Sequence, residues 1–84
     1  MSAAKTAGGE VDDALFERLR SWRATTAKTA GVPPYVIFHD ATLAAIAAAQ
    51  PASHAALGGI SGIGAKKLER YGDEILGLVA GADS

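Results

Sequence analysis

Only one stretch of this chain has the residue types of a β-strand. Residues 35–38 read Tyr, Val, Ile and Phe, and β-branched and aromatic side chains favour extended structure. The 84 residues contain no second stretch of this kind with which it could pair, and an isolated strand is not stable. We therefore predict an all-α fold in which these residues form an extended or single-turn connector. Alternation along it would bury Val36 and Phe38 and leave Tyr35 nearer the surface.

Capping and helix-breaking residues divide the chain into helices. Asp12 or Asp13 can accept hydrogen bonds from the first turn of one helix, and Gly31 is a good C-terminal stop for it. Asp40 is predicted to cap a second helix, which Pro51 ends. The inward face of the first helix is predicted from residues at i, i+4, i+7 and i+11 spacing: Leu15, Leu19, Trp22 and Thr26.

The C-terminal half of the chain carries the same kinds of boundary signal. Ser53 is predicted to cap a short third helix, and a glycine-rich turn at residues 62–64 leads into a fourth helix that would end at Gly72. Asp73 would then cap a fifth helix, which Gly81 closes. Five short helices joined by connections of a few residues indicate a compact all-α bundle.

The composition argues against catalysis and against a bound metal or cofactor. The chain has no cysteine, which excludes disulfides and thiolate zinc sites. His39 and His54 lack the paired spacing of a metal-binding helix, so each is interpreted as a surface or half-buried polar group. The sequence has no P-loop and no carboxylate cluster, and a chain of this length has little room for a closed active site. We therefore predict a domain that is not an enzyme and needs no cofactor.

One helical domain is expected over residues 12–81, with a tail at each end. Residues 1–11 are small and polar and are expected to form a disordered N-terminal tail, and residues 82–84 a short C-terminal tail. The start has no apolar signal-peptide region, and the longest apolar run, residues 41–49, is too short to cross a bilayer. We expect a cytoplasmic monomer that does not associate with membranes.

Basic residues are concentrated in the middle of the chain. The formal net charge of −1 argues against a strongly basic nucleic-acid binder. Between Arg18 and Arg70, however, seven basic residues accompany only two acidic ones, Asp40 and Glu69. This distribution predicts a weak basic patch on a domain that is nearly neutral overall.

Three separated segments of the chain resemble a known family. In order they read LFERLRSWR, VPPYVIFHDATLAAIA and LGGISGIGAKKLERYGDEIL, and together they are similar to the HRDC domain (helicase and RNase D C-terminal). The resemblance covers about residues 13 to 80. The combination of PPYVIFHDATL with GIGAKKLERYG is much more specific than either piece alone.

The resemblance implies a non-catalytic helical domain that accompanies an enzyme. HRDC domains belong to RecQ-type helicases, some UvrD-type helicases and RNase D-type nucleases, in which the chemistry resides in another domain. The resemblance implies weak binding of single-stranded or partly duplex DNA during DNA repair or recombination. The alternative is docking on the catalytic core of the parent helicase or on its partners, with little or no DNA binding. The PPY form and the KLERYG ending look most like the versions in bacterial DNA helicases, which is an argument by analogy.

Two roles are open for the turn at residues 60–64. Its glycines resemble the hairpin of helix-hairpin-helix DNA binders, in which Gly62 and Gly64 would let the backbone approach a phosphate at the start of the next helix. Lys66 and Lys67 in the first turn of that helix would add positive charge, against the preference of the helix dipole. Alternatively, the two glycines only permit positive φ angles and close packing of the helices.

An aromatic residue and three arginines complete the candidate nucleic-acid contacts. Tyr35 follows two prolines that stiffen its backbone, and an exposed ring could stack on an unpaired base; it could equally be a core tyrosine with its hydroxyl at the surface. The resemblance favours the binding role. Arg20 and Arg23 are predicted to share an outer helix face, which could also be simply solvated, and Arg70 belongs with the two lysines. Trp22 falls on the apolar stripe and is predicted to be a core residue.

Overall fold

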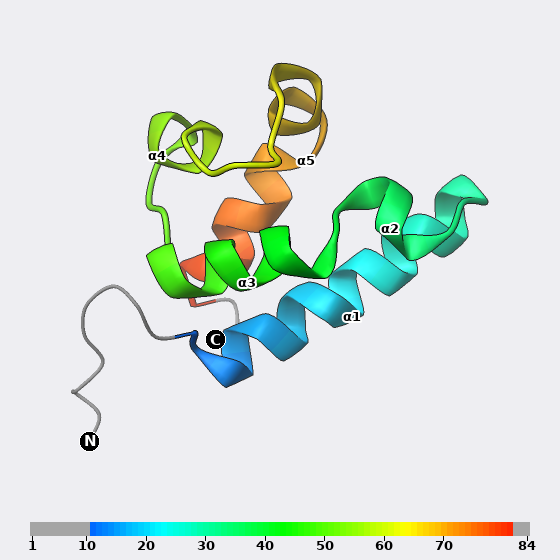
Figure 1. The fold of residues 1–84 in the computed structure, drawn as a ribbon, viewed down its shortest axis with the longest axis horizontal. Coiled ribbons are helices and arrows are strands. Elements are labelled where there is room, and N and C mark those ends of the chain that lie inside the picture. Colours follow the sequence, from blue (N-terminus) through cyan, green and yellow to red (C-terminus); the bar gives the residue numbers. More distant parts are fainter. Residues whose placement is uncertain (1–10, 82–84) are drawn as a thin grey trace.

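The chain folds into five helices, and the computed structural model describes residues 11–81 (Figure 1). The helices are α1 Asp13–Ala30, α2 Pro34–Ile37, α3 Asp40–Ala49, α4 His54–Gly58 and α5 Ala65–Val79. No strand occurs among the described residues, so the predicted all-α fold is confirmed. None of these helices is both long and apolar enough to cross a membrane. Of the predicted tails, residues 1–10 and 82–84 lie outside the described residues.

Local signals decide both ends of α1. The Asp12 carboxylate accepts a hydrogen bond from the Leu15 N–H at 3.1 Å, which satisfies one of the donors that a helix start leaves open. Gly31 takes the left-handed conformation at φ 72°, and its N–H donates back to the last turn of the helix. The predicted Ser53 cap of α4 is also present, because the Ser53 hydroxyl accepts from the Ala56 N–H at 3.1 Å. These predicted boundaries are confirmed.

The segment predicted as a connector forms a single helical turn, α2. Ile37 and Phe38 are buried, whereas Val36 is 43% exposed and Tyr35 is 60% exposed. The predictions for Phe38 and Tyr35 are confirmed, but the prediction that Val36 points inward is wrong. Alternation fails because residues 34–37 are helical, and successive side chains of a helix do not point to opposite faces.

Asp40 does not cap α3. His39 occupies the N-cap position without a side-chain hydrogen bond, and Asp40 is the first residue of the helix. The Asp40 carboxylate instead pairs with the Arg23 guanidinium at 2.7 Å. Arg23 also donates to the Phe38 carbonyl at 2.9 Å. The predicted cap is therefore wrong, because a partner on α1 holds the carboxylate and ties α1 to the start of α3.

The predicted boundary at Gly72 is also wrong, since α5 continues through it to Val79. Gly72 is buried, and a Cβ atom there would lie 3.0 Å from Cδ2 of His54. The next residue, Asp73, pairs with His54 Nε2 at 2.8 Å and caps no helix. A glycine inside a helix lowers stability by only about 0.5–1 kcal/mol relative to alanine, so α5 can continue through Gly72. The missing side chain lets α4 approach α5 closely.

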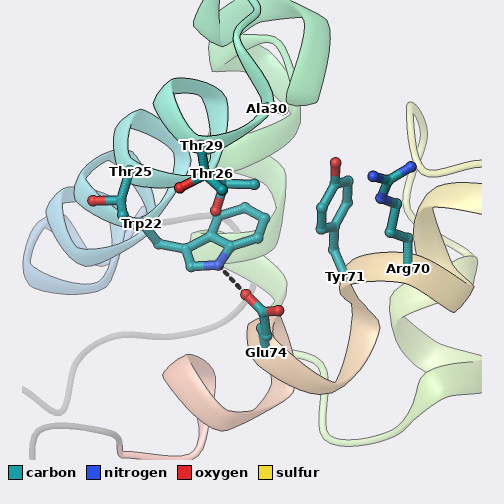
Figure 2. Close-up of a pocket in the computed structure, with 8 residues that line it drawn as sticks. All are labelled: Trp22, Thr25, Thr26, Thr29, Ala30, Arg70, Tyr71 and Glu74. Atoms are coloured by element: carbon teal, nitrogen blue, oxygen red, sulfur yellow. Dashed lines mark hydrogen bonds between the residues drawn. The ribbon is translucent and has the colours of Figure 1, made fainter.

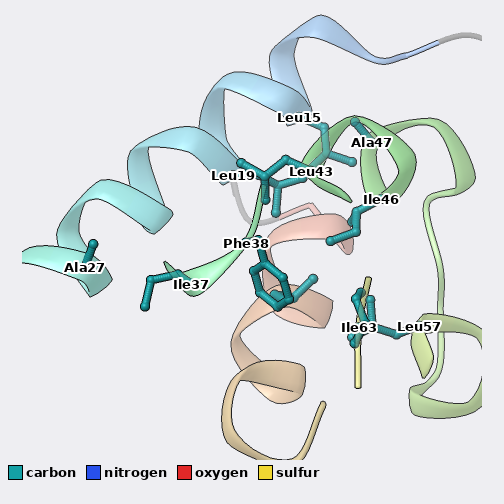
Figure 3. Packing of buried hydrophobic residues seen from close by; sticks show 11 residues of the cluster. Leu15, Leu19, Ala27, Ile37, Phe38, Leu43, Ile46, Ala47, Leu57 and Ile63 are labelled. Carbon is teal, nitrogen blue, oxygen red and sulfur yellow. The ribbon is translucent and has the colours of Figure 1, made fainter. Parts of the chain in front are cut away.

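The core lies where α1, α3, α4 and α5 meet (Figure 3). Its buried apolar residues are Leu15, Leu19, Ala27, Ile37, Phe38, Leu43, Ile46, Ala47, Leu57, Ile63 and Ile75. Phe38 stands near the middle, with the rings of Trp22 and Tyr71 at 6.1 and 6.0 Å between centroids. Trp22 is half-buried and packs against this cluster, so its predicted core role is confirmed only in part.

Candidate nucleic-acid interface

A surface groove of about 380 Å³, which we call the basic groove, separates α2 from the first turns of α5. Its lining includes Val32, Val36, Ile37, Lys66, Lys67 and Arg70. Three of the predicted contact residues, Lys66, Lys67 and Arg70, therefore meet in one place. Arg70 follows Lys66 by four residues and Lys67 by three, so each lysine lies next to Arg70 on the surface of α5, and the fold sets these residues opposite α2.

The three cations of the basic groove have different surroundings. Lys67 is half-buried: its Nζ donates to the Val36 carbonyl at 3.2 Å and lies 5.3 Å from the centre of the Phe38 ring. Lys66 is exposed at the rim. The Arg70 guanidinium lies 5.7 Å from the centre of the Tyr71 ring. Lys67 thus helps to hold α2 against α5, while Lys66 and Arg70 present their charges to solvent.

Tyr35 is not part of the lining of the basic groove, although the next residue, Val36, is. It is on the same helical turn as Val36, and its ring stacks on His39 with 6.2 Å between centroids and 23° between planes. At 60% exposure, much of the Tyr35 ring is open to solvent.

The two glycines of the turn before α5, Gly62 and Gly64, differ in their φ angles and in the space around them. Gly62 has φ 96°, and a Cβ atom there would collide with Oγ1 of Thr42 on α3. Gly64 has φ −82° and extended backbone, and a Cβ atom there would meet nothing within 4 Å. The packing role is thus clear for Gly62, with Ile63 buried beside it, whereas the expected positive φ is absent at Gly64. Gly64 occupies the N-cap of α5 without a side-chain cap, so it leaves the helix start open.

Arg20 and Arg23 lie apart from the basic groove, in a hollow of about 340 Å³ that includes Pro34. Arg20 is exposed and pairs with Glu17 at 3.3 Å. The Arg23 side chain is only 11% exposed and is held by Asp40 and the Phe38 carbonyl. Arg20 is therefore available at the surface, whereas Arg23 does not lie on the open outer face that the helix pattern predicted.

A second, larger groove was not predicted from the sequence. This groove of about 470 Å³, which we call the threonine groove, lies between the C-terminal half of α1 and the middle of α5 (Figure 2). Its lining includes Trp22, Thr25, Thr26, Thr29, Tyr71 and Glu74. The indole Nε1 of Trp22 donates to Glu74 Oε1 at 2.6 Å. The signal in the sequence was the spacing of Trp22 and the three threonines, which places hydroxyls where an amphipathic helix usually continues its apolar stripe.

Comparisons with known proteins agree with this architecture. A family model described as the HRDC domain matches residues 12–79. The chain is 52% identical over 77 residues to an ATP-dependent DNA helicase UvrD2 of Mycobacterium tuberculosis, which covers 92% of this chain and 11% of that protein. It is 43% identical over 70 residues to an ATP-dependent DNA helicase RecQ of Bacillus subtilis, which covers 83% of this chain and 12% of that protein.

A solved structure has the same fold. It is the RecQ HRDC domain 3 of D. radiodurans, with a TM-score of 0.78 and 38% identity over 83% of this chain and 92% of that chain. The chain thus spans only about a ninth of the curated relatives it matches, and that part corresponds to one helical domain. On the family match, the two kinds of helicase relative and the shared fold, this chain belongs to the HRDC domain family.

Proposed function

We propose that this HRDC domain is a non-catalytic accessory domain of an ATP-dependent DNA helicase and that it weakly binds single-stranded or partly duplex DNA. The names of the relatives support the parent class, because both UvrD2 and RecQ are ATP-dependent DNA helicases. In such a helicase the domain would have two partners, the DNA and the catalytic core. The role of the domain would be to help position the substrate strand.

The observation that carries this proposal is the meeting of Lys66, Lys67 and Arg70 in the basic groove, with Tyr35 exposed on the helical turn that supplies Val36 to the lining. Lysine and arginine neutralise backbone phosphates without regard to sequence. The start of α5, left open by Gly64, adds N–H donors and the positive end of the helix dipole. The Tyr35 ring offers a flat surface on which an unpaired base can stack.

The arrangement favours single strands and low affinity. Stacking on Tyr35 needs a base that is not already within a duplex, whereas the cations need only phosphate. Contact with three phosphates would give a salt slope of about −2, at about −0.7 per contact on a single strand. The net charge of −1 provides no long-range attraction to the strand.

Two variants should separate stacking from charge. Tyr35→Ala should weaken binding of a labelled single strand by about 1–3 kcal/mol and leave the salt slope unchanged, because it removes only a stacking surface. Lys66→Gln combined with Arg70→Gln should flatten the salt slope by about 1 or more, because it removes the two solvent-facing cations and keeps the hydrogen bond from Lys67 to Val36. Fluorescence anisotropy at several salt concentrations measures both quantities.

Lys28→Gln is the control for charge. It removes one positive charge from α1, where Lys28 is exposed and lines neither the basic groove nor any other hollow described above. It should therefore change neither the affinity nor the slope by much. The proposal would be contradicted if the wild-type domain bound no oligonucleotide at low salt, or if Lys28→Gln weakened binding as much as the double variant.

A docking role is the second candidate. Tyr35 and Val36 are exposed together at the tip of α2, next to Pro33 and Pro34. An exposed apolar tip on a nearly neutral domain also suits contact with the parent helicase core. In that case Val36→Asp, which places a charge on the exposed apolar surface, would abolish binding of the domain to a parent helicase core prepared without it. DNA binding would then be weak or absent in the wild type.

A further inference from the structure

The basic groove and the threonine groove adjoin each other at the surface. Arg70, Tyr71 and Ala30 line both of them. In Figure 2 the Arg70 and Tyr71 side chains stand on one side of the threonine groove, opposite the α1 residues. A strand held by Lys66 and Arg70 therefore has an adjoining space to enter once it passes Arg70.

The walls of the threonine groove suit a nucleotide. Trp22 and Tyr71 are both half-buried, with 5.5 Å between ring centroids and 80° between planes, so each keeps part of an aromatic surface in the groove. Thr25 and Thr29 are exposed on α1, and their hydroxyls can donate to phosphate or sugar oxygens. Arg70 supplies a cation at the shared rim.

Glu74 determines what kind of base fits. Its carboxylate accepts one hydrogen bond from Trp22 Nε1 at 2.6 Å, but an ionised carboxylate has about four acceptor positions and no donor. The remaining positions repel phosphate and carbonyl oxygens and accept N–H groups. The groove thus combines a cation for the backbone with an acceptor for a base edge.

We propose, building on the DNA binding proposed above, that the threonine groove binds an unpaired guanine of the same strand. Guanine carries adjacent N1–H and N2–H donors on its Watson–Crick edge, which match the two oxygens of a carboxylate. Adenine and cytosine place a ring acceptor beside their single amino group, and thymine flanks its one N–H with two carbonyl oxygens. Proteins recognise an unpaired base through hydrogen bonds to its Watson–Crick edge and through stacking on aromatic side chains. The threonine groove offers both kinds of contact.

The position of the groove next to the basic groove favours this occupant over a protein segment. Arg70 lines both grooves, so a strand whose phosphate it holds brings its next nucleotide towards Glu74. A nucleotide carries the negative charge and the N–H donors on different parts of one molecule. It can therefore satisfy both residues at once.

The test compares a labelled oligothymidylate with the same oligonucleotide carrying one central guanine. For the wild-type domain we expect about fivefold tighter binding of the guanine strand by anisotropy, in the range of a bidentate base contact. Inosine, which lacks the N2 amino group, should give an intermediate value. Because Trp22 is the only tryptophan of the chain, its emission should also respond more strongly to the guanine strand.

Variants test which residue causes the preference, which is the ratio of the dissociation constant of the oligothymidylate to that of the guanine strand. Glu74→Gln keeps an acceptor for Trp22 but replaces one carboxylate oxygen with a donor, so the ratio should fall to about one. Glu69→Gln removes the same charge from an exposed position of α5 outside the groove, and the ratio should persist. Tyr35→Ala should weaken both strands equally and keep the ratio.

Several outcomes would overturn the inference. If the wild type binds DNA with a ratio of about one, or if Glu69→Gln also removes the preference, the groove does not read guanine and the proposed DNA binding still stands. If the wild type binds neither strand, the proposed function fails with it. A Trp22 emission that changes with the separated helicase core but not with DNA would instead assign the groove to a protein partner.

Discussion

Replacing Phe38 with alanine should lower the free energy of unfolding by about 3–5 kcal/mol. Phe38 is 1% exposed, and it is the residue against which Trp22, Tyr71 and the Lys67 ammonium all pack. Alanine would leave a cavity lined by elements from both halves of the chain. Since domains are typically stable by about 5–15 kcal/mol, and small ones less so, the variant should be largely unfolded under mild conditions. Urea unfolding followed by far-UV circular dichroism measures the loss.

Tyr35→Ala serves as the control, because it removes a ring of similar size from the neighbouring turn. The Tyr35 side chain is mostly exposed, so its loss should change stability by no more than about 0.5 kcal/mol. An unfolding midpoint for Phe38→Ala close to that of Tyr35→Ala would contradict the central place assigned to Phe38. The same pair separates stability from binding, since only Tyr35 is proposed to contact DNA.

Gly62→Ala should be the most damaging of the glycine replacements. At φ 96° a non-glycine residue is strained, which costs about 1–3 kcal/mol. The new Cβ would also collide with the Thr42 side chain on α3, and overpacking of this kind typically costs a further 1–3 kcal/mol, roughly. The result should be a loose turn between α4 and α5, measured as a lower thermal midpoint.

The matched control is Gly77→Ala, which should have the opposite sign. Gly77 is exposed within α5, and a Cβ atom there would meet nothing within 4 Å. Alanine should therefore stabilise the helix by about 0.5–1 kcal/mol through its better helix propensity. If Gly62→Ala proved no more destabilising than Gly77→Ala, the close approach of the turn to Thr42 would not be needed for folding.

Signals that act within one turn of a helix could be read without a structure. The Asp12 and Ser53 caps and the Gly31 stop are of this kind, because each bonds to backbone groups only a few residues away. The all-α class could also be predicted from the sequence, because residues 35–38 have no second strand-forming stretch with which to pair. In the candidate site, Arg70 follows Lys66 by four residues and Lys67 by three, a spacing that indicates that each lysine lies next to Arg70 on the helix surface.

The predictions that proved wrong concern residues whose role depends on tertiary contacts or on the backbone conformation around them. Asp40 looks like a cap until Arg23, 17 positions earlier in the chain, is found beside its carboxylate, and Gly72 looks like a helix end until His54 is found packed against it. Val36 lies at the surface because residues 34–37 form a helical turn.

The grooves themselves also depend on tertiary structure. The basic groove exists because Lys67 and Phe38 bring α5 against α2, and the threonine groove exists because α5 passes along the second half of α1. Such pairings join residues distant in sequence, and their free energy depends on the packing of the whole core. Local pattern therefore determined α1, α3 and α4 of this domain, whereas the length of α5 and the surfaces between the helices were decided only by how the helices pack.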